Sequence, residues 1–177
     1  MKHLLTLLIL LLVSCKTDTK TETAKSDTVV VENSATDDIK LAIFDYNGLE
    51  PYLNKDDDKT HVVNFWATWC APCVKELPHF ETLNKNYKDR NVEVMLVSLD
   101  FPNQYEKKLK PFIKKHNLQS ELLVLDDVDQ NTWIPKVNEN WDGAIPVTII
   151  YNKDKRKFYD RPFTYEELET ELKQFLN

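Results

Sequence analysis

The chain has 177 residues, of which 42% are hydrophobic, enough for one domain of ordinary size once any targeting segment is set aside. Its formal net charge is −6 at pH 7. A nucleic-acid surface would show a basic stripe and an electrostatic membrane site a basic patch, so this charge balance argues against both. We therefore expect no nucleic-acid partner, and any membrane attachment must come from a specific segment.

The first 15 residues have the layout of an export signal. Lys2 precedes the apolar run 4–13, which is too short to span a bilayer comfortably. The run ends in residues 12–15, Leu-Val-Ser-Cys, which resemble the bacterial lipoprotein box. That resemblance implies cleavage before Cys15, lipid on its thiol and new amino group, and a periplasm-facing position in the cell envelope, anchored to the inner or the outer membrane. The alternative is a free Cys15 beside an uncleaved anchor.

A polar segment separates this signal from the rest of the chain. Residues 16–38 are rich in Thr, Lys, Asp, Glu and Ser, with one apolar interruption at 29–31. Such a composition is typical of a disordered tether. We therefore divide the chain into a lipoprotein signal peptide (1–15), a tether (16–38) and a single domain (39–177).

Apolar runs alternate with helical patterns along the domain, which predicts an α/β layer architecture. The final helix is expected to open with Thr164 and Glu167 in capping-box register. Pro111 is expected to mark the start of a short helix. The predicted elements are a short element at 39–53, a strand at 62–66, a helix at 70–87, a strand at 92–97, one or two short helices within 102–116, a strand at 122–125, a helix at 132–138, strands at 147–151 and 156–159, and the final helix with Leu168, Leu172, Phe175 and Leu176 on its apolar face.

Trp69-Cys70-Ala71-Pro72-Cys73 is an aromatic-flanked Cys-x-x-Cys at the junction of a predicted strand and a predicted helix. At a helix N-terminus, unpaired N–H groups and the macrodipole stabilise a thiolate, so the pKa of the Cys70 thiol should be lowered. Cys73 follows one turn later on the same face, within reach of Cys70. This arrangement favours dithiol–disulfide exchange.

The count of three cysteines favours a redox pair over a metal site or a structural crosslink. A structural zinc site needs four ligands, and the only other cysteine, Cys15, is far away in the sequence. With Cys15 assigned to lipid, no cysteine is left for a structural disulfide. A loop as short as 70–73 removes little chain entropy when it is closed. We therefore expect a catalytic Cys70–Cys73 pair and no metal.

Four stretches carry a resemblance to the thioredoxin-like family: residues 64–73 (NFWATWCAPC), 76–78 (ELP), 97–100 (VSLD) and 143–148 (GAIPVT). Within that family, residues 39–177 look like the membrane-tethered, extracytoplasmic thiol–disulfide oxidoreductases of the TlpA and ResA type. The resemblance implies a thioredoxin-like α/β fold, in which helices flank a central mixed β-sheet. It also implies the strand–helix insertion of this branch, between Asp100 and Gly143.

The resemblance further implies that Ile145-Pro146 is a cis bond opposite the cysteines. Its role would be to hold the backbone of Ile145 open for strand-like pairing with a substrate segment. Trp69, Ala71 and Pro72 would contact the substrate from the side of the cysteines. The alternative is an ordinary trans Pro146 at the first position of a strand.

Glu76 lies one helical turn beyond Cys73 and matches the glutamate of the Cys-x-x-Cys-x-x-Glu pattern in this branch. The resemblance implies that it transfers protons for the thiols, which makes it the third catalytic candidate. The alternative is a surface carboxylate on the helix. Cytoplasmic thioredoxins carry a buried Asp where this chain has Asn64, and an amide cannot transfer a proton. Glu76 is therefore the one acid–base candidate near the thiols.

These residues predict an enzyme in which Cys70 thiolate attacks a substrate disulfide and Cys73 resolves the mixed disulfide. The dithiol itself is the redox group, and no further cofactor is expected. Ala71-Pro72 supplies no cation and one backbone donor fewer, so the pair should be reducing. The resemblance also implies a reductant that is recharged by a membrane-embedded thiol reductase and acts, for example, on oxidised cytochrome c precursors. We expect a monomer.

Other classes of protein fit the sequence less well. A thioredoxin-fold copper chaperone needs a wider cysteine spacing and a distal His. A peroxidase needs a Thr three residues before its cysteine, where this chain has Ala67. A non-catalytic binding module would not need both thiols and Glu76. Trp133 and Trp141 either line a substrate groove or pack in the core, and His79 is either a metal ligand or a solvated helix residue.

Overall fold

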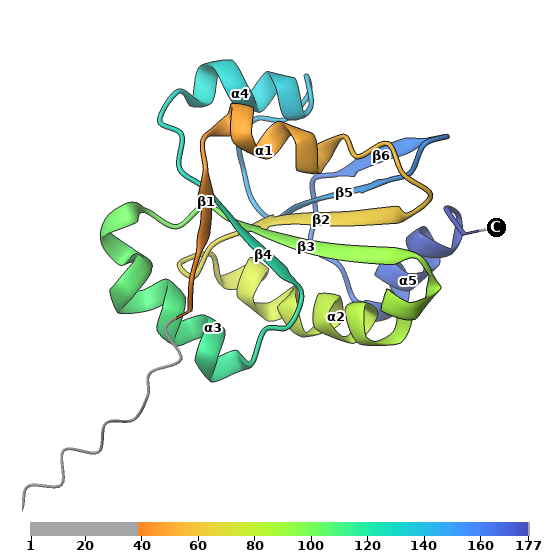
Figure 1. The fold of residues 1–177 in the computed structure, drawn as a ribbon, viewed down its shortest axis with the longest axis horizontal. Coiled ribbons are helices and arrows are strands. Elements are labelled where there is room, and N and C mark those ends of the chain that lie inside the picture. The colour runs from red at the N-terminus through yellow and green to blue at the C-terminus, as the bar shows by residue number, and fades with distance from the viewer. Residues whose placement is uncertain (1–38, 177) are drawn as a thin grey trace, which may run out of the picture. The chain divides into compact units, whose positions relative to one another are not determined.

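The structure, a computed structural model, describes residues 39–176. The signal peptide, the lipidation at Cys15 and the tether all lie outside the described residues. In chain order the elements are β1 (Ala42–Phe44), α1 (Tyr46–Leu53), β2 (Thr60–Trp66), α2 (Ala71–Tyr87), the 3-10 turn η1 (Lys88–Arg90), β3 (Val92–Ser98), the 3-10 turn η2 (Pro102–Gln104), the π-turn η3 (Tyr105–Leu109), α3 (Lys110–His116), β4 (Glu121–Leu125), α4 (Gln130–Val137), β5 (Val147–Tyr151), β6 (Arg156–Tyr159) and α5 (Tyr165–Lys173) (Figure 1).

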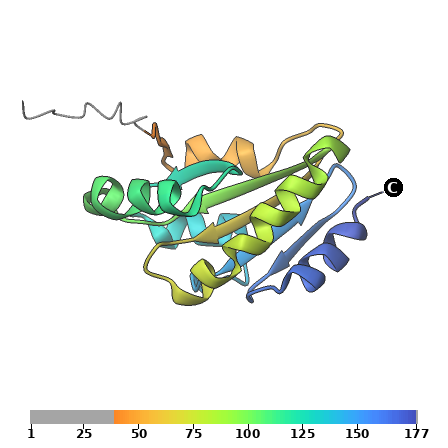
Figure 2. The same cartoon turned by 90° about the horizontal axis from the view of Figure 1, so that it is seen from below.

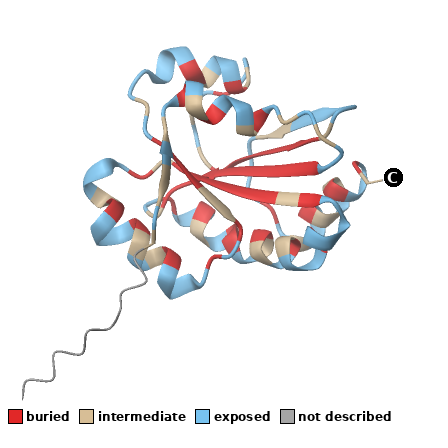
Figure 3. Cartoon of the chain, viewed as in Figure 1, coloured by how far each residue is buried: buried red, intermediate tan, exposed pale blue. Residues whose placement is uncertain are grey.

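The described strands form one mixed sheet in the order β1-β4-β3-β2-β5-β6. The neighbours β1, β4, β3 and β2 are parallel, whereas β5 is antiparallel to β2 and β6 is antiparallel to β5. Every residue of β2 and β5 is buried (Figure 3), as expected for strands that are covered on both faces. The predicted mixed sheet flanked by helices is confirmed.

Helices cover both faces of the sheet. On one face lie α2, α3 and α5 (Figure 2). These helices pack on the sheet through apolar side chains such as Phe80, Ile113 and Leu172. On the other face, α1 and α4 pack through side chains such as Leu49 and Trp133. The segment between Asp100 and Gly143 contains α3, β4 and α4, and β4 extends the sheet between β3 and β1. No helix of the described residues is long and apolar enough to cross a bilayer.

Most predicted elements agree with the structure and differ from it only at their ends. Two regions differ more: the one short element expected at 39–53 is the strand β1 followed by the helix α1, and the one or two short helices expected within 102–116 are η2, η3 and α3. β2 begins at Thr60, two residues before the predicted start, and continues the parallel pairing with β3. The polar side chain of His61 concealed this start, because it is buried by stacking on Tyr151 and by carboxylates at both ring nitrogens. The final helix ends at Lys173, so Phe175 and Leu176 pack from the segment that follows the helix. The Thr164–Glu167 capping box is confirmed.

Candidate active site

The two cysteines lie where β2 gives way to α2, beside the carboxyl ends of the parallel strands. Cys70 is the N-cap of α2, with an extended backbone, and its sulfur accepts a hydrogen bond of 3.3 Å from the backbone N–H of Cys73. Caps of this kind satisfy one of the four free N–H groups at a helix start. The predicted position of Cys70 at the helix N-terminus is therefore confirmed. Open α/β sheets usually bind their ligands at this end of the strands.

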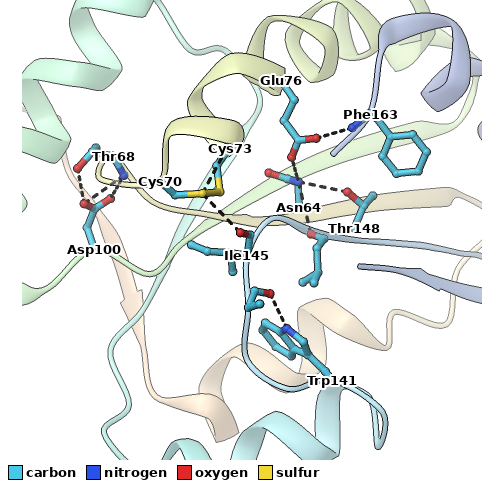
Figure 4. Close-up of a disulfide and its surroundings, with 12 residues drawn as sticks. Asn64, Thr68, Cys70, Cys73, Glu76, Asp100, Trp141, Ile145, Thr148 and Phe163 are labelled. Atoms are coloured by element: carbon cyan, nitrogen blue, oxygen red, sulfur yellow. Dashed lines mark hydrogen bonds between the residues drawn. A yellow bond between two sulfur atoms is a disulfide. The ribbon is translucent and has the colours of Figure 1, made fainter. Parts of the chain in front are cut away.

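Cys70 and Cys73 form a disulfide, with their Cα atoms 5.3 Å apart (Figure 4). The two cysteines differ in their exposure to solvent. Cys70 is 6% exposed, whereas Cys73 is fully buried in the core on the α2 face of the sheet. An incoming disulfide therefore reaches Cys70 more easily than Cys73.

The Ile145-Pro146 bond is cis, so the alternative of a trans proline is wrong. The carbonyl oxygen of Ile145 lies 3.6 Å from the sulfur of Cys70 (Figure 4). Ile145 is half-buried and Pro146 is buried at the start of β5. The loop with Ile145, to which the resemblance assigned substrate pairing, thus lies directly against Cys70, the less buried cysteine.

Glu76 is only 2% exposed, so its interpretation as a surface carboxylate is wrong. Its two carboxyl oxygens accept from different donors. Oε1 accepts from Asn64 Nδ2 on β2 at 2.9 Å, and Oε2 accepts from the backbone N–H of Phe163, just before α5, at 2.8 Å (Figure 4). Both donors are nitrogen atoms, so neither of these two bonds joins Glu76 to a cysteine sulfur. Glu76 on α2 is thus linked to β2 and to the segment before α5.

Burial raises the pKa of Glu76 to about 7 from its ordinary value of 4.5. Removal from water disfavours the charged carboxylate, and this effect exceeds the opposite effect of the two hydrogen-bond donors, which stabilise the charge. Beside Glu76 is a surface pocket of about 290 Å³, which Pro72, His79 and Phe163 also line. A buried carboxyl that titrates near neutral pH next to a reactive pair is typical of a functional site.

The remaining residues assigned from the sequence are divided between the rim and the core. Trp69, Ala71 and Pro72 are exposed around the disulfide. Trp133 and Trp141 are buried, so of the two roles considered for them packing in the core is confirmed. The indole N–H of Trp141 donates to the carbonyl of Ala144 at 2.7 Å, which supports the loop before Ile145 from below.

Sequence reasoning gave no role to a buried carboxylate next to the site. Asp100 follows β3 and accepts hydrogen bonds from the backbone N–H and the hydroxyl of Thr68 (Figure 4). It also accepts a hydrogen bond from the hydroxyl of Ser98. Asp100 and Ser98 were noted as part of the resemblance, but their link to Thr68 joins segments 32 residues apart in sequence. This link fixes the loop that leads into Trp69 and Cys70.

The sheet, the capped cysteine pair and the cis-proline loop define a thiol–disulfide oxidoreductase of the thioredoxin-like class. The chain belongs to the AhpC/TSA family, whose sequence pattern it matches over residues 31–156. The resemblance to thioredoxin-like oxidoreductases is therefore confirmed.

Individual relatives agree with this class. The thiol-disulfide oxidoreductase ResA of a Bacillus cereus strain is 30% identical over 114 residues, 64% of this chain and 61% of that protein. ResA of Geobacillus kaustophilus is 29% identical over 147 residues, 82% of this chain and 78% of that protein. Two crystal structures share the fold. A DsbF homologue from Corynebacterium diphtheriae has a TM-score of 0.56 at 21% identity, covering 71% of this chain and 75% of that one. A candidate thiol-disulfide oxidoreductase from Bacteroides vulgatus has a TM-score of 0.53 at 27% identity, covering 68% and 80%.

Proposed function

We propose that the protein is an extracytoplasmic reductant of protein disulfides, with the Cys70–Cys73 dithiol as its redox group and no further cofactor. The observation that supports this most directly is the setting of Cys70. Cys70 caps α2 and is the less buried cysteine of the pair, and its sulfur faces the carbonyl of Ile145. The N–H of Cys73 points at its sulfur and would stabilise a thiolate there.

In the reduced protein, the Cys70 thiolate attacks one sulfur of the substrate disulfide. The substrate S–S bond breaks, a mixed disulfide forms, and the first substrate thiolate leaves and takes up a proton. Cys73 then gives its proton to the Glu76 carboxylate or to water, and its thiolate attacks the sulfur of Cys70. The second substrate thiolate leaves, and two electrons have passed from the dithiol to the substrate. A pKa of about 7 suits Glu76 to accept and release this proton.

The substrate is held as an extended segment across the disulfide. We assign its backbone pairing to Ile145, whose position Pro146 fixes, and its other contacts to Trp69, Ala71 and Pro72. The half-buried Ile145 and the exposed Trp69 stand on different segments beside Cys70. A strand added in this way gains affinity from main-chain hydrogen bonds, whatever its sequence.

The direction of electron flow follows from the groups around Cys70. Ala71 and Pro72 bring no positive charge, and Pro72 has no N–H to offer the thiolate. A weakly stabilised thiolate makes the dithiol a better electron donor. We propose that a membrane-embedded thiol reductase recharges the pair, that protein disulfides such as the oxidised haem-binding cysteines of cytochrome c precursors are the substrates, and that the protein acts as a monomer.

We also propose that Cys15 carries a lipid that anchors the protein to a membrane of the cell envelope. The support is the short apolar run 4–13 that ends at this cysteine, followed by a polar segment. A fatty-acid label should be incorporated into the full chain and lost in Cys15→Ala, which should also be processed poorly. A native chain that is processed normally without lipid would refute the anchor.

A single-turnover experiment tests the reductase. Pre-reduced protein is mixed with a peptide that carries a Cys-x-x-Cys-His disulfide, and the peptide thiols are counted. One equivalent of protein should reduce one equivalent of peptide, and Cys70→Ala should reduce none. The proposal fails if the reduced protein leaves the peptide disulfide intact while the oxidised protein oxidises the peptide dithiol.

A further inference from the structure

Two exposed aromatic rings lie next to the redox pair. Trp69 is 51% exposed and Phe101 is 56% exposed, and their rings are stacked with centroids 6.2 Å apart and planes 16° apart. Among the described residues, two other large apolar side chains are exposed, Ile43 at 46% and Val128 at 95%, and neither is aromatic. Exposed aromatic surface gains free energy when it is covered, so a stacked pair at a reactive centre is a candidate contact for a partner.

The two aromatic rings are positioned by a buried carboxylate, that of Asp100. Asp100 accepts a hydrogen bond of 3.0 Å from the backbone N–H of Thr68, and a second bond from the hydroxyl of Thr68. Thr68 directly precedes Trp69, and Asp100 directly precedes Phe101. The same hydrogen bonds that join the two loops therefore bring the two rings together. A surface that is ordered before binding loses less conformational entropy when a partner arrives.

We propose that Phe101 determines substrate specificity: together with Trp69 it binds an apolar or aromatic side chain next to the substrate disulfide. This inference rests on the proposed reductase function. Trp69 is the residue before Cys70, and the carbonyl of Ile145 lies 3.6 Å from the sulfur of Cys70. A segment that pairs with Ile145 while its disulfide meets Cys70 must extend one flank past Trp69. Phe101 adds a second exposed ring to the apolar surface that this flank meets.

The test uses three peptides of equal length with the same Cys-x-x-Cys disulfide, preceded by Phe, Ser or Lys. The second-order rate constant for oxidation of the pre-reduced protein is measured with each peptide and with 2-hydroxyethyl disulfide. The wild-type protein should prefer the Phe peptide. Phe101→Ala should lower the rate with that peptide about tenfold, which corresponds to about 1.4 kcal/mol and lies within the range of one aromatic contact. Rates with the Ser peptide and with 2-hydroxyethyl disulfide should change less than about twofold.

Two matched variants complete the design. Phe101→Tyr keeps the ring and should keep the preference, whereas Val128→Ala removes another exposed apolar side chain and should leave all rates unchanged. The inference is overturned if Phe101→Ala slows every substrate equally, if it slows none, or if the wild-type protein prefers the Lys peptide. Failure of the reductase proposal looks different, because the wild-type protein would then reduce neither the peptides nor 2-hydroxyethyl disulfide.

Discussion

Asn64 on β2 donates a hydrogen bond of 2.9 Å from its amide to a carboxyl oxygen of Glu76 on α2, and both side chains are buried. The amide also lies 3.2 Å from the hydroxyl of Thr148 on β5. Asn64, whose amide cannot transfer a proton, thus orients the carboxyl group of Glu76, which can. An amide at position 64 suits a buried Glu76, because a carboxylate at position 64 would repel the carboxylate of Glu76.

The first prediction concerns the role of Glu76 in proton transfer. Glu76→Gln should slow disulfide exchange on the order of 100-fold near neutral pH, because an amide cannot accept a proton. Loss of the nearby negative charge should also lower the apparent pKa of the coupled thiols. Exchange rates of both proteins, measured across pH, decide the matter. Superimposable rate profiles would make Glu76 a bystander and leave the proton transfers to water.

Glu76→Gln is not a neutral replacement for the fold. Both carboxyl oxygens accept hydrogen bonds, and Gln offers one oxygen and one NH₂ group. One of the donors, Asn64 Nδ2 or the N–H of Phe163, then faces another donor. Unpaired buried donors cost about 1–3 kcal/mol, so activity must be compared on folded protein.

A second prediction follows from the raised pKa of Glu76. Between its ordinary value of 4.5 and about 7, the folded protein holds a proton that the unfolded chain has released. The contribution of Glu76 to stability is therefore greatest below pH 4.5 and is lost as the pH rises through 7, a change on the order of 3 kcal/mol. Urea unfolding at pH 5 and pH 8 should show a larger loss of stability for the wild-type protein than for Glu76→Gln. Equal losses in the two proteins would contradict the prediction.

The third prediction assigns the nucleophile. Cys73→Ala should accumulate mixed disulfides through Cys70, because attack proceeds and resolution is blocked. Adducts with the peptide disulfide are detected by mass spectrometry under non-reducing conditions, with the double variant Cys70→Ala/Cys73→Ala as the control. Trapping by Cys70→Ala and not by Cys73→Ala would reverse the two roles.

A fourth prediction concerns Asp100. Asp100→Ala removes the acceptor for two hydroxyls and for the backbone N–H of Thr68, and leaves those donors next to a cavity. The free energy of unfolding should fall by roughly 3 kcal/mol, whereas replacement of the exposed Asp160 by Ala should change it by less than about 0.5 kcal/mol. Chemical denaturation of both variants provides the measurement. A loss as small as that of Asp160→Ala would show that the link to Thr68 adds nothing to stability.

Local patterns were sufficient to predict most of the fold. Strand β4 contains the continuous apolar run 122–125, and α5 begins with a capping box, so both could be located from neighbouring residues alone. The cysteine pair was expected from its spacing at the predicted start of a helix, and the cis bond at Pro146 was expected from the resemblance to a known family. His61 shows the limit, because a polar residue at the start of β2 is buried by partners that the local sequence does not reveal.

The parts of the site that depend on distant contacts could not be predicted. Glu76 accepts from Phe163, which is 87 residues further along the chain, and no pattern near either residue indicates that contact. Two interpretations of Glu76, a proton-transferring residue or a surface carboxylate, were therefore open. The stacking of Phe101 on Trp69 likewise depends on the arrangement of two loops that follow neighbouring strands.

The function proposed for the Cys70–Cys73 pair is that of a reductant. Its reduction potential, measured by equilibration with glutathione or dithiothreitol buffers, tests this most directly. With the uncharged residues Ala71 and Pro72 between the cysteines and a backbone N–H 3.3 Å from the sulfur of Cys70, the potential should be more negative than about −200 mV, towards the range of thioredoxin. A potential near about −120 mV, typical of strongly oxidising proteins, would contradict this function and make the protein a donor of disulfides.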